Sequence, residues 1–157
     1  MKTELWLIGK TSFPYLNEGM GIYQKRLKHY LSFHLHIIPD IKNRKNLKEE
    51  QIKQKEGNEI LKKLNPSDCL ILLDENGKNY DSVAFSKFLD QKFQHSHKRL
   101  IFQIGGAYGF SDAVYQRANA KISLSKMTFS HQMVRLIFLE QLYRGMTILR
   151  GEPYHHV

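Results

Sequence analysis

The chain has 157 residues, 41% hydrophobic and 25% charged, a composition that fits one folded domain and argues against wholesale disorder or a collagen-like repeat. Twenty-four Lys and Arg against fifteen Asp and Glu give a net charge of +9, which favours a polyanionic partner such as nucleic acid. A lone cysteine, Cys69, excludes a disulfide framework and a thiolate zinc site, and the early apolar run at residues 5–8 is too short to cross a bilayer. We therefore expect one domain over residues 1–157, cytoplasmic, with no metal and no membrane segment.

The first part of the chain alternates strand and helix patterns. Residues 2–9 predict a strand that ends at a glycine, and Pro14 begins a helix that extends to about residue 31. Residues 33–38 alternate apolar side chains with histidine, as in a half-buried strand. Residues 42–63 are rich in Lys and Glu, and their sparse apolar positions predict a helix whose lysines form either a solvated face or a contact with RNA.

The same alternation continues through the middle of the chain. Residues 68–73 are continuously apolar and predict a strand buried on both faces, followed by a polar turn at residues 74–78. Asp81 or Ser82 then caps the next helix. Another buried strand is predicted at residues 99–104, directly before a pair of glycines.

The last third contains a short helical segment from Ser111, a brief strand at residues 120–124 and a loop at residues 125–130. From His131 to about residue 149 runs the most apolar helix of the chain. The order of elements predicts the α/β class, with a mostly parallel sheet joined by right-handed crossovers and flanked by helices.

Three loops lie where a parallel sheet of this kind binds ligands, beyond the carboxyl ends of its strands. They follow Leu73, begin at Gly105 and span residues 124–129. The glycines do not form a dinucleotide-binding G-x-G-x-x-G motif, because Ala107 and Phe110 stand at two of the required positions. They do leave bare backbone that a flat ligand could approach closely.

Two features of the C-terminal part have alternative explanations. His131, Arg135, Glu140 and Arg144 interrupt the apolar last helix, which fits either a solvated edge or the polar margin of a homodimer interface. The terminal Tyr-His-His at residues 154–156 is either solvent-exposed filler or a tail that brings an imidazole to a pocket.

Four motifs resemble a known family. They are Ile-Gly-Gly-x-x-Gly from residue 104, Leu-Ser-Lys-Met-Thr-Phe-Ser-His-Gln-Met-Val-Arg from residue 124, Glu-Gln-Leu-Tyr-Arg from residue 140 and Pro-Tyr-His-His from residue 153. Together they resemble the bacterial pseudouridine N3-methyltransferases of the large ribosomal subunit, which belong to the SPOUT superfamily. The resemblance covers the whole chain, is most specific in the last third and departs at Ser130, where the family has proline.

The resemblance implies properties that the patterns alone do not. It implies a deep trefoil knot in the C-terminal part, against the usual rule of unknotted connections. It also implies a homodimer that uses S-adenosylmethionine to methylate N3 of a pseudouridine in 23S rRNA of the assembled ribosome. Carried over residue by residue, the implied cofactor contacts are Leu73, Gly105, Leu124, Ser125, Lys126, Met127, Thr128 and Phe129.

Methylation of an imide nitrogen requires loss of its proton, so we expect a base near the substrate. His155 is the first candidate, because imidazole titrates near neutrality. Tyr154 could stack on the base or hydrogen-bond to its edge, and Arg144 could hold a phosphate or stabilise the developing imidate. Arg135 is a second phosphate candidate, and His131 could cap or orient the loop before the last helix. We expect the tail of one subunit to complete the site of the other.

Two other function classes are compatible with parts of the sequence. A non-enzymatic ribosome-binding factor with a vestigial pocket would explain the charge, but not the match at residues 124–129. A phosphate-handling hydrolase could use His131, Arg135 and His155, but it would need an activated nucleophile or a metal cluster. Binding of S-adenosylmethionine separates the methyltransferase from both.

Overall fold

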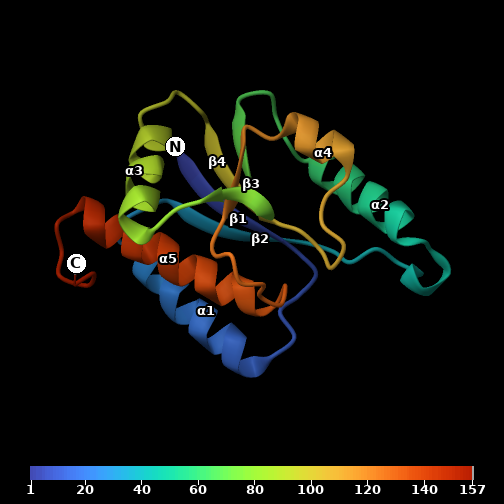
Figure 1. Ribbon diagram of the computed structural model, residues 1–157, viewed down its shortest axis with the longest axis horizontal. Helices are drawn as coiled ribbons and strands as arrows, with labels where there is room; N and C mark the ends of the chain where they lie inside the picture. The colour runs from blue at the N-terminus through green and yellow to red at the C-terminus, as the bar shows by residue number, and fades with distance from the viewer. Residues whose placement is uncertain (157) are drawn as a thin grey trace.

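Five parallel strands form one sheet in the computed structural model, which describes residues 1–156 (Figure 1). The spatial order is β2-β1-β4-β3-β5, and every neighbouring pair is parallel. This confirms the helix-flanked, mostly parallel sheet predicted from the order of elements. The strands are β1 (Lys2–Ile8), β2 (Phe33–Ile38), β3 (Asp68–Asn79), β4 (Arg99–Ile104) and β5 (Ala120–Ser123).

Helices cover both faces of the sheet (Figure 1). One face carries α1 (Pro14–Leu27), α3 (Ser82–Phe93) and α5 (Met133–Leu149), with α5 in contact with both of the others. The opposite face carries α2 (Glu49–Lys62) and the short α4 (Asp112–Arg117), and a single 3-10 turn, η1 (Arg44–Asn46), precedes α2. No helix within residues 1–156 is both long enough and apolar enough to span a membrane.

The buried residues explain why the strands are so apolar. Successive side chains of a strand point to opposite faces, so Leu5 and Leu7 of β1 pack under α1, α3 and α5, whereas Trp6 and Ile8 pack under α2 and α4. Because both faces are covered, a strand in the centre of the sheet has no solvent side. The apolar runs at residues 69–73 of β3 and 100–102 of β4 follow from this arrangement.

Some element boundaries differ from those predicted. Helix α1 ends at Leu27, because residues 28–30 form a turn instead of a further helical turn. Helix α5 begins at Met133, two residues after the predicted start at His131. Of the two predicted caps, Asp81 is confirmed, since it accepts a hydrogen bond from the Ala84 backbone N–H. Ser111, where a helical segment was predicted to start, is the N-cap of α4 and accepts a hydrogen bond from the Val114 backbone N–H.

Strand β3 continues through the segment predicted as a polar turn, and that prediction was wrong. Both Leu73 and Lys78 pair with Ile122 of β5, so residues 74–77 form a bulge between two stretches that follow the same neighbour. A Cβ atom on Gly77 would lie 2.6–2.8 Å from the backbone atoms of Ile122. The bulge therefore requires glycine at its point of closest approach to β5.

Candidate functional site

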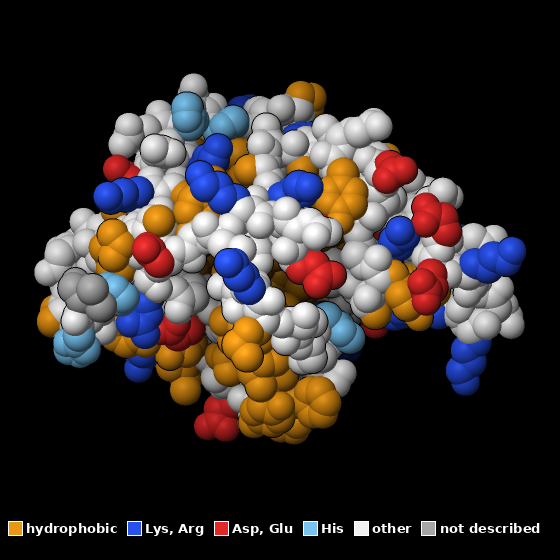
Figure 2. Space-filling view, in the orientation of Figure 1, with side chains coloured by type: hydrophobic (Ala, Val, Ile, Leu, Met, Phe, Trp, Pro, Cys, Tyr) orange, Lys and Arg blue, Asp and Glu red, His pale blue; other side chains and the backbone are white. Residues whose placement is uncertain are grey.

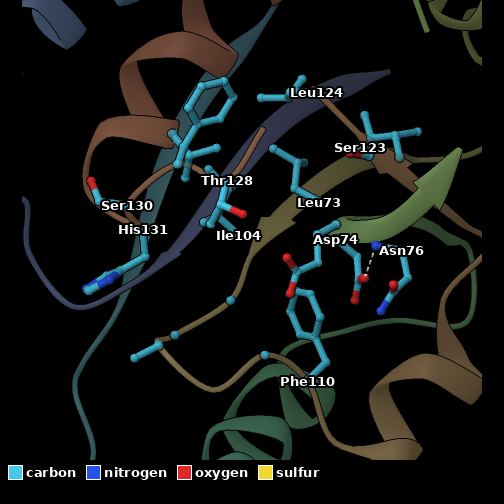
Figure 3. Close-up of a pocket in the computed structure, with 18 of the residues that line it drawn as sticks. Leu73, Asp74, Asn76, Ile104, Phe110, Ser123, Leu124, Thr128, Ser130 and His131 are labelled. Atoms are coloured by element: carbon cyan, nitrogen blue, oxygen red, sulfur yellow. Dashed lines mark hydrogen bonds between the residues drawn. The ribbon is translucent and has the colours of Figure 1, made fainter. Parts of the chain in front are cut away.

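A cavity of about 530 Å³ opens at the bulge of β3 and at the carboxyl ends of β4 and β5 (Figure 3). It lies where open α/β sheets bind ligands, and its size is that of a small-molecule pocket. Three loops line it, and they are the three that the sequence singled out. The expected cofactor contacts that line the cavity are Leu73, Gly105, Leu124, Ser125, Met127, Thr128 and Phe129.

Lys126 is the one expected cofactor residue that does not line the cavity. It lies in the same loop, and its side chain is exposed. Two short contacts shape this loop: Ser123 donates its hydroxyl proton to the Ser125 carbonyl at 2.9 Å, and the Met127 N–H donates to the Ser125 hydroxyl at 3.0 Å. Both keep the chain tightly folded as it leaves β5.

Apolar side chains form the inner wall of the cavity. Leu73 precedes the bulge of β3, Ile104 ends β4 and Leu124 follows β5, and the three side chains surround the centre of the cavity in the close-up (Figure 3). Opposite them, residues 105–109 supply mostly backbone, and Gly109 adopts a positive φ of 83° that favours glycine. A flat, partly apolar ligand would find both covering side chains and accessible backbone groups here.

One side of the cavity is polar. The Asp74 carboxylate accepts a hydrogen bond from the Tyr115 hydroxyl and another, at 2.8 Å, from the Asn76 backbone N–H (Figure 3). Burial and the bond to Asp74 raise the pKa of the Tyr115 hydroxyl, so Tyr115 stays a donor. Sequence analysis missed both residues, since it assigned Asp74 to a turn; the signal available was a carboxylate directly after a buried strand.

The C-terminal tail forms a second polar cluster beside the end of α5. Arg144 donates two hydrogen bonds to Glu140 Oε1, at 2.5 and 3.0 Å, and contacts His155 Nδ1 at 3.1 Å. The Tyr154 hydroxyl donates to the same Glu140 oxygen at 3.1 Å, and its ring lies 4.7 Å from the Arg144 guanidinium carbon. Because guanidinium nitrogens only donate, Nδ1 is the acceptor in its contact with Arg144.

Charge and burial also adjust the protons of this cluster. The hydrogen bond to Glu140 raises the pKa of Arg144, which therefore stays cationic. Burial, with the hydrogen bond to Tyr23 and the charge of Glu140, raises the pKa of the Tyr154 hydroxyl. Tyr154 is thereby held in its protonated form, as a donor.

A single chain does not bring all the expected catalytic residues to the cavity. His131 lines the cavity at the start of α5, whereas Arg144, Tyr154 and His155 form their cluster at the other end of this helix (Figure 1). Met133 and Arg144 are eleven residues apart, which corresponds to roughly 16 Å at 1.5 Å per residue. The two groups of residues therefore belong to separate regions of one chain.

Arg135 occupies a structural position that conflicts with its expected role as a phosphate contact. Its side chain is fully buried. The guanidinium donates to the backbone carbonyls of Ile8 (2.7 Å), Gly9 (3.0 Å) and His131 (3.2 Å), and to the Thr11 hydroxyl at 2.9 Å. Since its donors are used inside the protein, Arg135 holds the chain after β1 against the start of α5 and presents nothing to a phosphate.

The lysine-rich segment presents cations to solvent on η1 and α2. Lys45 and Lys48 are exposed, whereas Lys53 forms an ion pair with Glu50 at 3.1 Å. Contact with RNA stays a prediction for this segment. Within residues 1–156 no group of three or more His, Cys, Asp or Glu side chains could hold a metal ion.

Comparison with known proteins adds a family and a set of relatives. Residues 1–155 match the family described as "Predicted SPOUT methyltransferase". The chain is 59% identical over 156 residues to a protein of Parabacteroides distasonis and 59% to one of Flavobacterium johnsoniae, and 52% to one of Bacteroides thetaiotaomicron. Each match covers 99% of both chains, and each relative is named "Ribosomal RNA large subunit methyltransferase H".

Proposed function

Because the chain belongs to the SPOUT methyltransferase family, we propose that it transfers a methyl group from S-adenosylmethionine to ribosomal RNA of the large subunit. The names of its relatives support this RNA as the substrate class. The net charge of +9 suits a polyanionic partner. The observation that carries the proposal is the cavity at the bulge of β3 and the ends of β4 and β5, lined by seven of the eight residues that the family resemblance assigns to the cofactor.

The residues around the cavity fit this cofactor. Leu73, Ile104 and Leu124 would cover the faces of an adenine ring, while backbone groups of the loops would pair with its edge. Residues 105–109 allow close approach, since three of the five are glycines. When bound, S-adenosylmethionine supplies an electrophilic methyl group on a positively charged sulfur.

We assign the target atom as N3 of a pseudouridine, as the family resemblance implies. This imide nitrogen carries a proton that must leave before or during attack. Tyr154 is held protonated by its surroundings, so among the tail residues His155 remains as the acceptor of that proton. In the free chain Arg144 donates to His155 Nδ1 at 3.1 Å, so Nε2 carries the imidazole proton. When Arg144 turns to the negative charge that develops on the nucleobase, Nδ1 is freed to take the N3 proton.

A homodimer would unite the two separated parts of this site. Figure 2 shows hydrophobic side chains gathered over the start of α1, next to α5, and Phe13, Tyr15 and Ile22 are between 46% and 59% exposed there. A patch of this kind on a protein surface is typical of an interaction site. We propose that a second copy covers it and brings its own tail to the cavity, so that His131 of one subunit faces His155 of the other.

The proposal is tested with assembled ribosomes from cells that lack this protein. The purified chain and S-adenosylmethionine should add one methyl group to the RNA, and mass spectrometry of RNA fragments should place it on a pseudouridine. Methylation of a different nucleotide would contradict the assigned target atom. A chain that binds the ribosome but gives no heat with S-adenosylmethionine in calorimetry would be a binding factor instead.

A further inference from the structure

Glu56 is a carboxylate buried directly behind the glycine wall of the cavity. It lies on α2 with 3% of its surface exposed. A Cβ atom on Gly106 would lie 2.6 Å and 2.7 Å from the two Glu56 oxygens. The carboxylate therefore rests against the backbone of the loop at residues 105–109.

The charge on Glu56 has no direct partner. Within residues 1–156 its Oε2 atom accepts no hydrogen bond, and no cation lies within ion-pair distance of it. The nearby cations are engaged elsewhere: Arg44 pairs with Asp40 at 3.4 Å, and Lys53 pairs with Glu50 at 3.1 Å.

No solvent in the space between α2 and the loop at residues 105–109 screens the negative charge of Glu56. Ile8, Gly57, Ile60 and Phe110 help to line it, and it has no room for a water molecule. Burial is the main cause that raises the pKa of Glu56 to about 6, with Asp40 raising it further and Arg44 opposing the shift. The carboxylate is thus largely ionised at pH 7.5 and poorly screened.

A thin wall separates this charge from the ligand cavity. Gly105, Gly106, Gly109 and Phe110 line both the cavity and the narrow space that contains Glu56. Because three of these four residues have no side chain, the wall consists of one layer of backbone beside the Phe110 ring. A charge in such a dry environment acts on a ligand across this wall more strongly than it would through water.

We propose that Glu56 is a specificity-determining residue that makes the cavity prefer the positively charged methyl donor to its neutral product. This inference rests on the proposed function. S-adenosylmethionine and S-adenosylhomocysteine differ by one methyl group and by the positive charge on sulfur. The Glu56 carboxylate attracts that positive charge. Transfer of the methyl group leaves the sulfur neutral, so the product is no longer attracted. The product therefore binds more weakly than the donor and is replaced by it.

The test compares the dissociation constants of the two ligands by calorimetry at pH 7.5. The ratio of product to donor constants should fall about tenfold in Glu56→Gln, because the substitution removes the carboxylate charge that attracts the positively charged sulfur. Glu49→Gln removes the same charge from an exposed position on the same helix, keeps the Lys53–Glu50 ion pair and should leave the ratio unchanged. An unchanged ratio in a folded Glu56→Gln protein would overturn the proposal.

A second measurement needs no substitution at Glu56. In the unmodified chain the ratio should decline as the pH falls from 7.5 to 5, because protonation removes the charge; a constant ratio would also overturn the proposal. Histidines change charge in the same interval, so the series is repeated with His131→Asn, in which the decline should persist. If neither ligand binds the unmodified chain, the proposed function fails, whereas binding without charge preference refutes only the role of Glu56.

Discussion

Two charged residues, Arg135 and Glu56, are almost fully buried, but they differ in whether the protein supplies hydrogen-bond partners for the charge. Four acceptors surround the Arg135 guanidinium, whereas one Glu56 oxygen has no partner. A buried charge with partners contributes to a defined structure, while one without partners costs free energy. Arg135 therefore stabilises the fold around the site, whereas Glu56 contributes an uncompensated negative charge next to it.

Arg135→Met tests the framework role. The substitution leaves three carbonyls and one hydroxyl without their donor, so we expect the free energy of unfolding to fall by about 3 kcal/mol. Arg150→Met is the matched control: Arg150 is exposed and donates to a single carbonyl, that of His29, at 3.3 Å, so its loss should cost under about 1 kcal/mol. Urea unfolding measures the free energy of unfolding of both variants. Equal losses would show that the buried hydrogen bonds of Arg135 stabilise the protein no more than the exposed one of Arg150.

The raised pKa of Glu56 also predicts how stability depends on pH. Its folded-state value of about 6 lies above the ordinary value of 4.5, so its contribution to stability is present at low pH and is lost as the pH rises through 6. Between pH 5 and pH 8 the unmodified chain should lose roughly 1 kcal/mol more than Glu56→Gln. Denaturant unfolding at both pH values checks this, and parallel losses would contradict the assigned shift.

At the scale of elements, the bulge of β3 is the feature that shapes the cavity. It allows β3 to pair with β5 on both sides of residues 74–77 and brings Asp74 to the cavity. Sequence patterns could not reveal it, because polar residues after a buried strand are far more often a turn. Pairing of the second stretch, at Lys78 and Asn79, depends on where β5 lies and not on local residue preference.

Gly77→Ala tests the close contact within this bulge. The added Cβ would meet backbone atoms of Ile122, which cannot move without displacing β5. We expect a loss of about 1–3 kcal/mol in the free energy of unfolding, together with weaker binding of S-adenosylmethionine. Gly21→Ala in α1 introduces the same methyl group where nothing lies within 4 Å, and it should be neutral or stabilising by up to about 1 kcal/mol. A stable Gly77→Ala protein with normal affinity would contradict this account.

Other elements were predictable because the physical signals agreed. Strands β2 and β4 begin and end where the sequence placed them. Alternation identified β2, and a largely apolar segment that ends at a pair of glycines identified β4. The start of α5 was less predictable, because His131 and Gln132 follow the helical pattern but lie in a turn before Met133.

At the scale of the whole molecule, the position of the tail cluster decides how many chains make one site. The proposed arrangement predicts that a chain truncated after Gly151 binds S-adenosylmethionine normally but does not methylate RNA. It lacks Tyr154 and His155, yet retains every residue that lines the cavity. Calorimetry and a methylation assay on assembled ribosomes measure the two properties, and full activity of the truncated chain would refute a catalytic role of the tail.

Mixing two inactive variants separates an action of the tail within its own chain from an action on the partner. The truncated chain keeps its cavity, and Leu124→Arg places a large charged side chain in the apolar wall but keeps the tail. In a twofold dimer, half of randomly mixed molecules contain one complete site, so about a quarter of normal activity should return. A mixture without activity would indicate that each tail serves its own chain.

The sequence indicated the three loops of the cavity but not the distance between the cavity and the tail. The loops were predictable because the carboxyl ends of parallel strands meet at one edge. The separation of His131 from His155 depends on the length and direction of α5, and the burial of Arg135 depends on the path of the chain after β1. The knot implied by the resemblance stays a prediction.

The arrangement of α5 between α1 and α3 has a consequence for synthesis of the chain. Strand β1 pairs with β4, which lies almost a hundred residues later, and α5 covers both earlier helices only at the end. Translation proceeds at about 5–20 residues per second, so the apolar sides of α1 and α3 stay uncovered for several seconds while the remaining residues emerge. A nascent chain of this kind is a natural client for chaperones that shield apolar surface at the exit of the ribosome.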